Sequence, residues 1–227
     1  MTARKNIAKR LYRMFPKRIK RLVVPNKGNV NPSVDFVNCV KLVKSKTNGP
    51  IRIAEIGVDK GASSTVVIKL LDASDTLDLF DRESCEFFQN LKNVESNGKI
   101  NIYACSDKEY DSYFWELAKV YEQIPDSAIY DVVYLDGSHT YPVDGATVPL
   151  LMKMLKRGGI LILDDTDWTM AASPTCNTQE NKTKFTRDQM ISPHVALLER
   201  LFLRDNQDFS KMKNSDQNHK RSIYEKV

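Results

Sequence analysis

Short apolar runs alternate with segments of helical spacing along most of this chain, and this alternation predicts the fold. The runs with strand character are Ile51 to Val58, Thr76 to Asp81, Lys99 to Asp107, Val132 to Leu135 and Ile160 to Leu163. The segments with helical character are Asn31 to Lys46, Thr65 to Leu71, Glu83 to Leu91, Tyr110 to Gln123, Val148 to Leu155 and Pro193 to Leu203. Strands that alternate with helices form parallel sheets covered on both faces, so we predict an α/β, doubly wound, mostly parallel sheet.

Local signals indicate where some of these elements end. The run from Lys156 to Gly159, two basic residues and then two glycines, is typical of a helix C-terminus. We therefore expect the preceding helix to stop there and the next strand to begin at Ile160. Near the end of the chain, Phe209 to Met212 and Ser222 to Val227 are strand-like with no helical segment between them, which predicts a C-terminal antiparallel hairpin.

Acidic residues follow two of the predicted strands. Asp136 comes directly after one apolar run, with His139 close behind it, and Asp164 and Asp165 come directly after the next. A strand–helix–strand unit brings both ends to the same carboxyl edge of the sheet, where open α/β sheets place their sites. Three converging carboxylates repel one another unless a cation such as Mg²⁺, Mn²⁺ or Ca²⁺ lies among them. The alternative is that these acids only cap helices or face water.

A glycine-containing turn follows the first predicted strand. Gly57 and Gly61 let the backbone approach a ligand closely, and Ser63 lies where a helix N-terminus can hold a carboxylate or phosphate. Roughly 20 residues later, Asp81 ends the second strand at a place suited to hydrogen-bonding ribose hydroxyls. Asp81 is equally able to cap the helix that follows it.

Positive charge is concentrated at the N-terminus. Residues 1–34 hold ten Lys or Arg and no Asp or Glu, whereas the rest of the chain holds 24 basic and 29 acidic residues. Residues 1–30 therefore form a basic arm, and residues 4–22 combine apolar and basic positions at helical spacing. Such a segment is compatible with contact to an anionic membrane surface or an acidic partner, or with simple solvation. Contact with nucleic acid is the option that we favour least.

Composition indicates an ordinary globular chain. With 41% hydrophobic and 28% charged residues, it has no apolar run long enough to span a membrane as a helix and no secretory signal pattern. The four cysteines lack metal-ligand spacing, which favours reduced thiols. We therefore expect a cytoplasmic protein, with peripheral contact at the inner face of the membrane as an option for the arm.

Three motifs carry a resemblance to a known family: EIGVDKGASS, YLDGSHTY and GGILILDD. Together they make the stretch from Ile51 to Trp168 resemble a Rossmann-like class I S-adenosylmethionine-dependent methyltransferase. Within that superfamily the motifs resemble the metal-dependent macrocin (TylF-like) sugar O-methyltransferases, and more distantly the small catechol-type enzymes. Asp59 and Ala62 depart from the pattern, because relatives often have an aromatic residue and a glycine there. The resemblance implies one methyltransferase domain over residues 31–227. Residues 166–190 are polar and irregular, and a loop of this length next to Asp164 and Asp165 is a candidate lid or acceptor-binding loop.

The resemblance also implies a role for individual residues. S-adenosylmethionine would be bound by Glu55, Gly57, Gly61, Ser63, Asp81, Ser106, Asp107 and Asp136. Mg²⁺ or Mn²⁺ would be bound by Asp136, Asp164 and Asp165, and His139 stands where the family keeps its general base.

The implied reaction is methylation of a carbohydrate hydroxyl on a surface glycan, a glycolipid, a nucleotide-linked sugar or a glycosylated metabolite. A sugar hydroxyl does not ionise at neutral pH unaided, so a cation and a base such as His139 would be needed. Trp168 is suited to stacking on a sugar face, or else to packing. The alternatives are another small acceptor, such as a catechol, and a non-catalytic module that docks through the basic arm. A homo-oligomer also remains open.

Overall fold

The computed structural model describes residues 31–91, 94–108, 110–124, 127–214 and 220–227. The basic arm lies outside the described residues, and so does its predicted contact with a membrane or a partner. The chain divides into the units Met1–Asn31 and Pro32–Val227, and only the second is described below. Within the described ranges, no helix is both long enough and apolar enough to cross a membrane.

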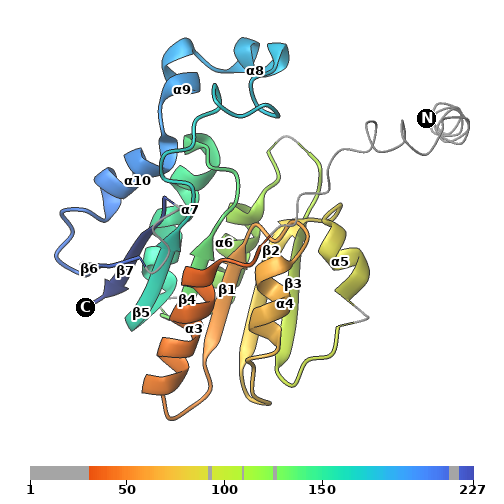
Figure 1. Ribbon diagram of the computed structural model, residues 1–227, viewed down its shortest axis with the longest axis vertical. Coiled ribbons are helices and arrows are strands. Elements are labelled where there is room, and N and C mark those ends of the chain that lie inside the picture. The colour runs from red at the N-terminus through yellow and green to blue at the C-terminus, as the bar shows by residue number, and fades with distance from the viewer. Residues whose placement is uncertain (1–30, 92–93, 109, 125–126, 215–219) are drawn as a thin grey trace, which may run out of the picture. The chain divides into compact units, whose positions relative to one another are not determined.

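Seven strands form one sheet in the order β3-β2-β1-β4-β5-β7-β6 (Figure 1). They are β1 (Arg52–Ile56), β2 (Thr76–Arg82), β3 (Lys99–Cys105), β4 (Tyr130–Leu135), β5 (Leu155–Leu163), β6 (Phe209–Met212) and β7 (Ser222–Lys226). β1 to β5 pair in parallel, whereas β7 runs antiparallel to both β5 and β6. The predicted mostly parallel sheet and the predicted C-terminal hairpin are both confirmed.

Helices cover both faces of this sheet, and two short ones, α8 and α9, lie beyond its edge. The helices are α3 (Val34–Lys46), α4 (Ala62–Ile68), α5 (Glu86–Asn90), α6 (Tyr113–Gln123), α7 (Tyr141–Met154), α8 (Gln179–Lys184), α9 (Arg187–Ile191) and α10 (His194–Phe202). Ser33 caps α3, because its hydroxyl accepts a hydrogen bond from the backbone N–H of Phe36. Three residues of the predicted helix therefore precede its actual start at Val34.

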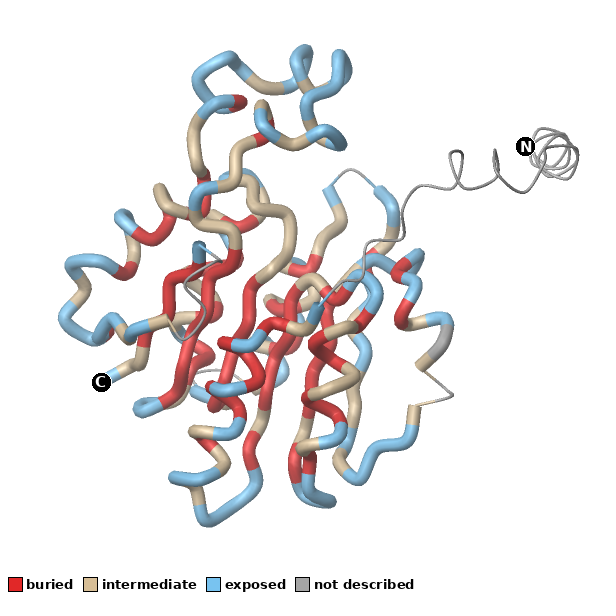
Figure 2. The backbone as a smooth tube through the Cα atoms, in the orientation of Figure 1, coloured by how far each residue is buried: buried red, intermediate tan, exposed pale blue. Residues whose placement is uncertain are grey.

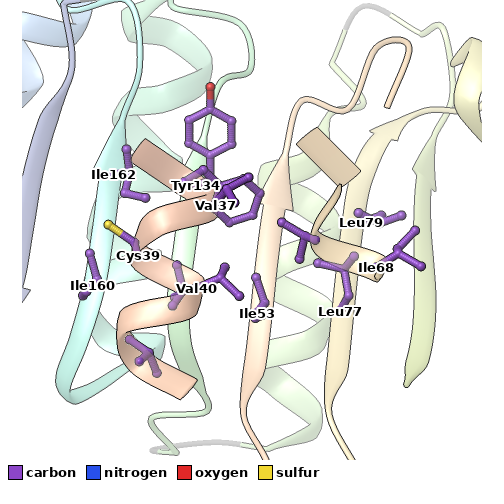
Figure 3. Close-up of a cluster of buried hydrophobic side chains, with 14 of the residues drawn as sticks. Val37, Cys39, Val40, Ile53, Ile68, Leu77, Leu79, Tyr134, Ile160 and Ile162 are labelled. Carbon is purple, nitrogen blue, oxygen red and sulfur yellow. The ribbon is translucent and has the colours of Figure 1, made fainter. Parts of the chain in front are cut away.

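The strands divide the core into two layers because successive side chains point to opposite faces. In β1, Ile53 joins the cluster beneath α3 and α4, while Ala54 joins the cluster beneath α6, α7 and α10. Figure 3 shows the first of these layers, and Figure 2 shows the buried strands that run between the two. Strands buried on both faces read as continuous apolar runs, which is why the sequence pattern located them.

The helix end predicted at Lys156 to Gly159 is wrong. α7 ends at Met154, and the next residue, Leu155, is already extended and pairs with Tyr130 in the sheet. Gly158 has φ +75°, and the register between β4 and β5 shifts between Tyr130 and Val132. A left-handed glycine can serve an irregularity within a strand as well as a helix end, so the two can give the same local sequence signal.

Residues 166–190, predicted to be an irregular loop, contain two short helical segments. Thr178 caps α8, and Thr186 caps α9 with a complete capping box to Gln189. Figure 1 shows both helices beyond the edge where β4 and β5 end, and Figure 2 shows that most of this segment is exposed. Its suggested role as a lid or acceptor-binding segment stays a prediction.

Candidate active site at the carboxyl edge of the sheet

The acids predicted to converge lie at one edge of the sheet. Asp136 follows β4 and Asp165 follows β5, and both lie close to the imidazole of His139. His139 Nε2 is 3.5 Å from Asp136 Oδ1 and 3.8 Å from Asp165 Oδ2. One ligand atom from each of these three residues lies within 4.8 Å of the others, and among the described residues they form the one such group.

The backbone is strained where two of these side chains are presented. His139 has φ +54° and Asp165 has φ +52°, both in the left-handed region that residues with a Cβ seldom adopt. Such strain costs on the order of 1–3 kcal/mol and persists only where the surrounding structure imposes it. The turns after β4 and β5 are therefore built to bring these two residues toward Asp136.

The cluster concentrates negative charge. Burial of the carboxyl group and the negative charges of Asp164 and Asp165 together raise the pKa of Asp136 to about 7. The pKa of Asp165 is also raised, by burial and by Asp164 and Asp167, although His139 opposes this shift. Two half-buried carboxylates beside an imidazole are a donor set that suits Mn²⁺, Mg²⁺ or a similar divalent cation. The residues present therefore fit the metal that the family resemblance implies.

Asp164, the third predicted ligand, is placed differently. Its side chain is only 5% exposed, and Arg221 Nε lies 3.0 Å from it. Its Oδ1 also accepts the backbone N–H of Asp165 at 2.8 Å, and the hydroxyl of Tyr134 donates to its Oδ2. The structure thus separates Asp164, which is turned to Arg221, from the group around His139.

Tyr134 connects the two sets of acids. Its ring stacks on Phe36 with 4.7 Å between centroids, and Figure 3 shows its hydroxyl pointing away from the apolar cluster. That hydroxyl contacts the carboxylates of both Asp164 and Asp136, the latter at 3.1 Å. The hydroxyl therefore donates its single proton to two carboxylates, which holds the two acids together at this edge.

The predicted glycine turn lies beside these acids. Gly57 has φ +86°, and a Cβ added there would lie 1.9 Å from the carbonyl oxygen of Asp136. Gly61 has φ +70°, and a Cβ there would lie 2.1 Å from the ring of Phe87. Both positions therefore require glycine, and the turn after β1 lies directly against the residue that follows β4.

The residues expected around the turn are engaged within it. Glu55 is buried and accepts a hydrogen bond from the hydroxyl of Ser64 at 2.7 Å, and burial raises the pKa of this carboxyl to about 8. Ser63 accepts the backbone N–H of Ser33 at 2.9 Å, which ties α4 to the start of α3. Ser63, predicted to bind cofactor, is thus placed as a link between helices.

Asp81 holds the turn from the neighbouring strand. Its Oδ2 accepts the backbone N–H groups of Val58 and Asp59 at 2.7 and 2.8 Å, and its Oδ1 accepts that of Arg82 at 2.7 Å. A carboxylate has about four acceptor positions, so one remains on Oδ1 for a ligand hydroxyl. Asp81 thus supports the turn, and its contact with a ribose stays a prediction.

Ser106 and Asp107 follow β3 on the far side of Asp81. Ser106 donates both its N–H and its hydroxyl to Asp111, at 2.8 and 2.6 Å. Asp107 is exposed, accepts the hydroxyl of Ser84 at 3.3 Å and lies 3.6 Å from Arg82. The carboxyl ends of these strands therefore follow one another along the edge in the sheet order β3, β2, β1 and β4.

Sequence reasoning missed a buried group beneath His139. The Tyr113 hydroxyl donates to Asp144 and accepts the backbone N–H of Ser138 at 2.7 Å. Asp144 is 1% exposed, and its Oδ2 has no hydrogen-bond partner among the described residues. Burial raises the pKa of Asp144 to about 6. Tyr113 comes from α6 and Asp144 from α7, so no local pattern links them.

Trp168 stands beside the predicted base. Its ring centroid is 5.5 Å from that of His139, and the two planes are tilted by 49°. The backbone N–H of Trp168 donates to the carbonyl of Asp165 at 3.0 Å, which fixes the tryptophan next to the acids. An aromatic surface therefore borders the cluster.

Comparison with known proteins places this geometry in context. Residues 54–166 match the model of a family described as a methyltransferase domain. No curated protein matches the sequence. The matched segment runs from β1 to the residue after Asp165, and so contains the turn and both acidic strand ends.

Several solved structures share the fold. An O-methyltransferase from Bacillus cereus in complex with SAH is 14% identical, with 85% of this chain and 80% of that chain covered and a TM-score of 0.53. The O-methyltransferase TomG from Streptomyces achromogenes, involved in tomaymycin synthesis and in complex with SAM, is 13% identical, with 85% and 79% covered and a TM-score of 0.55. The MycE methyltransferase of the mycinamycin biosynthetic pathway, in complex with Mg and SAH, is 15% identical, with 86% and 55% covered and a TM-score of 0.50. At such identities the likeness shows the fold, which is the predicted Rossmann-like class I arrangement with antiparallel C-terminal strands.

Proposed function

We propose that this chain, a methyltransferase with the class I fold of S-adenosylmethionine-dependent enzymes, methylates a carbohydrate hydroxyl with the help of a divalent cation. The observation that carries the proposal is the group formed by Asp136, His139 and Asp165. It stands at the carboxyl edge of the sheet, next to the glycine turn of a methyltransferase domain. Neither the cation nor the acceptor follows from the family model alone.

The cofactor would lie along the turn after β1. Asp81, at the end of β2, would bind a ribose hydroxyl, and Glu55, near the end of β1, would line the methionine end. S-adenosylmethionine supplies a methyl group on a positively charged sulfur. The methyl passes to the acceptor oxygen, the sulfur becomes a neutral thioether, and the hydroxyl proton must go to a base. Ser106 and Asp107, which follow β3 at the same edge of the sheet, would flank the adenine.

His139 is the base in this proposal. Its Nε2 faces the carboxylates of Asp136 and Asp165, so a hydroxyl held at those carboxylates lies within reach of the imidazole. A divalent cation lowers the pKa of a hydroxyl that it contacts and stabilises the negative charge that develops. Asp136 and Asp165 would hold that cation, and they would also fix which hydroxyl faces the methyl group.

Two features support a sugar acceptor. The motifs resemble the macrocin group of sugar O-methyltransferases, and Trp168 presents an aromatic ring beside His139, as sugar-binding sites often do. The same ring would also stack on a catechol, whose two hydroxyls can bind a cation together. A catechol-like acceptor is therefore the second candidate. A surface glycan, a glycolipid, a nucleotide-linked sugar and a glycosylated metabolite all offer the required neighbouring hydroxyls.

The test is transfer of labelled methyl from S-adenosylmethionine to a panel of methyl glycosides with neighbouring hydroxyls, with catechols in parallel. We expect labelled glycosides in Mn²⁺ or Mg²⁺ and none in EDTA. His139→Asn should lower turnover by roughly 10²- to 10⁴-fold, which is the usual contribution of a general base.

A matched pair of variants controls for charge. Asp165→Asn should abolish cation-dependent transfer, whereas Asp167→Asn, the same change at an exposed neighbour outside the group, should leave it near wild type. Transfer that persists in EDTA would overturn the role of the cation. Labelling of catechols alone would show that the acceptor is a catechol and not a sugar. Full turnover in folded His139→Asn would show that His139 is not the general base.

A further inference from the structure

Arg221 is the buried cation of the acidic edge. It stands just before β7, its side chain is 5% exposed, and its Nε lies 3.0 Å from Asp164 Oδ1 and 3.0 Å from Asp164 Oδ2. Its Nη1 lies 3.5 Å from Asp35 in the first turn of α3. A fixed positive charge is therefore built into the same edge that the proposed function assigns to a divalent cation.

Both oxygens of the Asp164 carboxylate already accept hydrogen bonds. Oδ1 accepts the backbone N–H of Asp165, and Oδ2 accepts the hydroxyl of Tyr134 and the Nε–H of Arg221. The Nε of Arg221 also lies 3.0 Å from Oδ1. Burial of the side chain adds to this, because a cation would have to displace one of these donors to reach it.

Asp136 and Asp165 differ from Asp164 in their exposure and in their partners. Their side chains are 37% and 46% exposed, and each has an oxygen facing His139. Neither forms an ion pair with Arg221 in the structure. The three acids therefore divide into two open carboxylates and one that is already neutralised.

We propose that Arg221 is a positioning residue that keeps Asp164 from contacting the cation and thereby limits the affinity of the edge for divalent ions. The proposal rests on the proposed function, since it concerns the cation of that same site. With Asp164 withheld, the protein supplies one ligand fewer, and coordination positions stay open for two oxygens of the acceptor. A cation held by all three carboxylates would bind tightly but would have less room for a chelating diol.

The experiment is calorimetric titration of the full chain with Mn²⁺, without S-adenosylmethionine or acceptor. Arg221→Gln removes the positive charge and frees Asp164, so we expect Mn²⁺ to bind on the order of tenfold more tightly. Arg221→Lys keeps the positive charge, so its affinity for Mn²⁺ should stay close to that of wild type. Thermal unfolding of each variant confirms that it is folded.

A second variant keeps the test decisive if Arg221→Gln fails to fold. The double variant Asp164→Asn/Arg221→Gln replaces the buried pair by neutral side chains of similar size, which proteins tolerate far better than a single unpaired charge. It should bind Mn²⁺ within about threefold of wild type, because the pair is neutral overall and does not touch the cation.

The outcomes separate the two proposals. Loss of Mn²⁺ binding in the folded double variant would mean that Asp164 is a ligand and would overturn the role of Arg221. Unchanged or weaker binding in folded Arg221→Gln would do the same. Failure of the wild-type protein to bind Mn²⁺ at all would instead overturn the metal-dependent function, and this inference with it.

Discussion

The contact between Gly57 and Asp136 allows a quantitative test of how the site is held together. In Gly57→Ala the new Cβ would lie 1.9 Å from the carbonyl oxygen of Asp136, whereas ordinary contact begins at 3.4 Å. The turn after β1 and the segment after β4 would have to separate by roughly 1.5 Å. Because Asp136 belongs to the segment that must move, the substitution should disturb the site as well as the fold.

The cost follows from two effects. An alanine at φ +86° in the left-handed region costs about 1–2 kcal/mol. Forcing additional volume into a packed contact costs about 1–3 kcal/mol more. The free energy of unfolding should therefore fall by about 2–5 kcal/mol in total, which urea denaturation monitored by circular dichroism can measure.

Gly158→Ala is the matched control. Gly158 has φ +75°, but a Cβ added there has nothing within 4 Å. It should carry the left-handed cost of about 1–2 kcal/mol without the clash. Mn²⁺ affinity, measured by calorimetry, should fall in Gly57→Ala and stay at the wild-type value in Gly158→Ala. Equal destabilisation of the two variants, with unchanged Mn²⁺ binding in both, would refute the proposed coupling between the glycine turn and Asp136.

Two further predictions concern the charges of the site. Burial and neighbouring acids raise the pKa of Asp136 to about 7, so the folded protein holds a proton there that the unfolded chain releases. The stability that this group contributes is fully present below its ordinary pKa and is lost as pH rises toward 7. The melting temperature of Asp136→Asn should therefore fall less than that of wild type between pH 5 and pH 7.5. An equal fall in the two proteins would contradict the raised pKa of Asp136. Tyr134→Phe removes the hydroxyl that contacts Asp136 and Asp164 but keeps the ring on Phe36. It should lower the free energy of unfolding by about 1–3 kcal/mol in a urea titration, and an unchanged value would show that the hydroxyl contributes nothing to the pairing of these acids.

The sequence was sufficient to predict the neighbourhood of the acids. A parallel strand–helix–strand unit leaves both strand ends at the same edge, so the proximity of Asp136 and Asp165 follows from topology alone. His139 joins them because only a short turn separates it from Asp136. The same reasoning located the glycine turn after β1 and the ribose candidate Asp81 after β2.

The partner of Asp164 was beyond such reasoning. Arg221 lies 57 residues later, just before β7, which runs antiparallel to β5, and no local periodicity indicates which side chain it will face. The pairing of Tyr113 with Asp144 could not be predicted either, because it depends on how α6 and α7 pack together. The irregular register around Gly158 was misread because such a strand irregularity and a helix end can both place glycine in the left-handed conformation.

The central claim is most directly tested by calorimetric titration of S-adenosylmethionine and its demethylated product, each with and without Mn²⁺. We predict that both bind, that Mn²⁺ binds at a separate site, and that Asp165→Asn loses the Mn²⁺ site while it keeps the cofactor. Absence of cofactor binding under both conditions would contradict the account and would favour a non-catalytic module. Cofactor binding without any Mn²⁺ site would leave the methyltransferase and remove the metal.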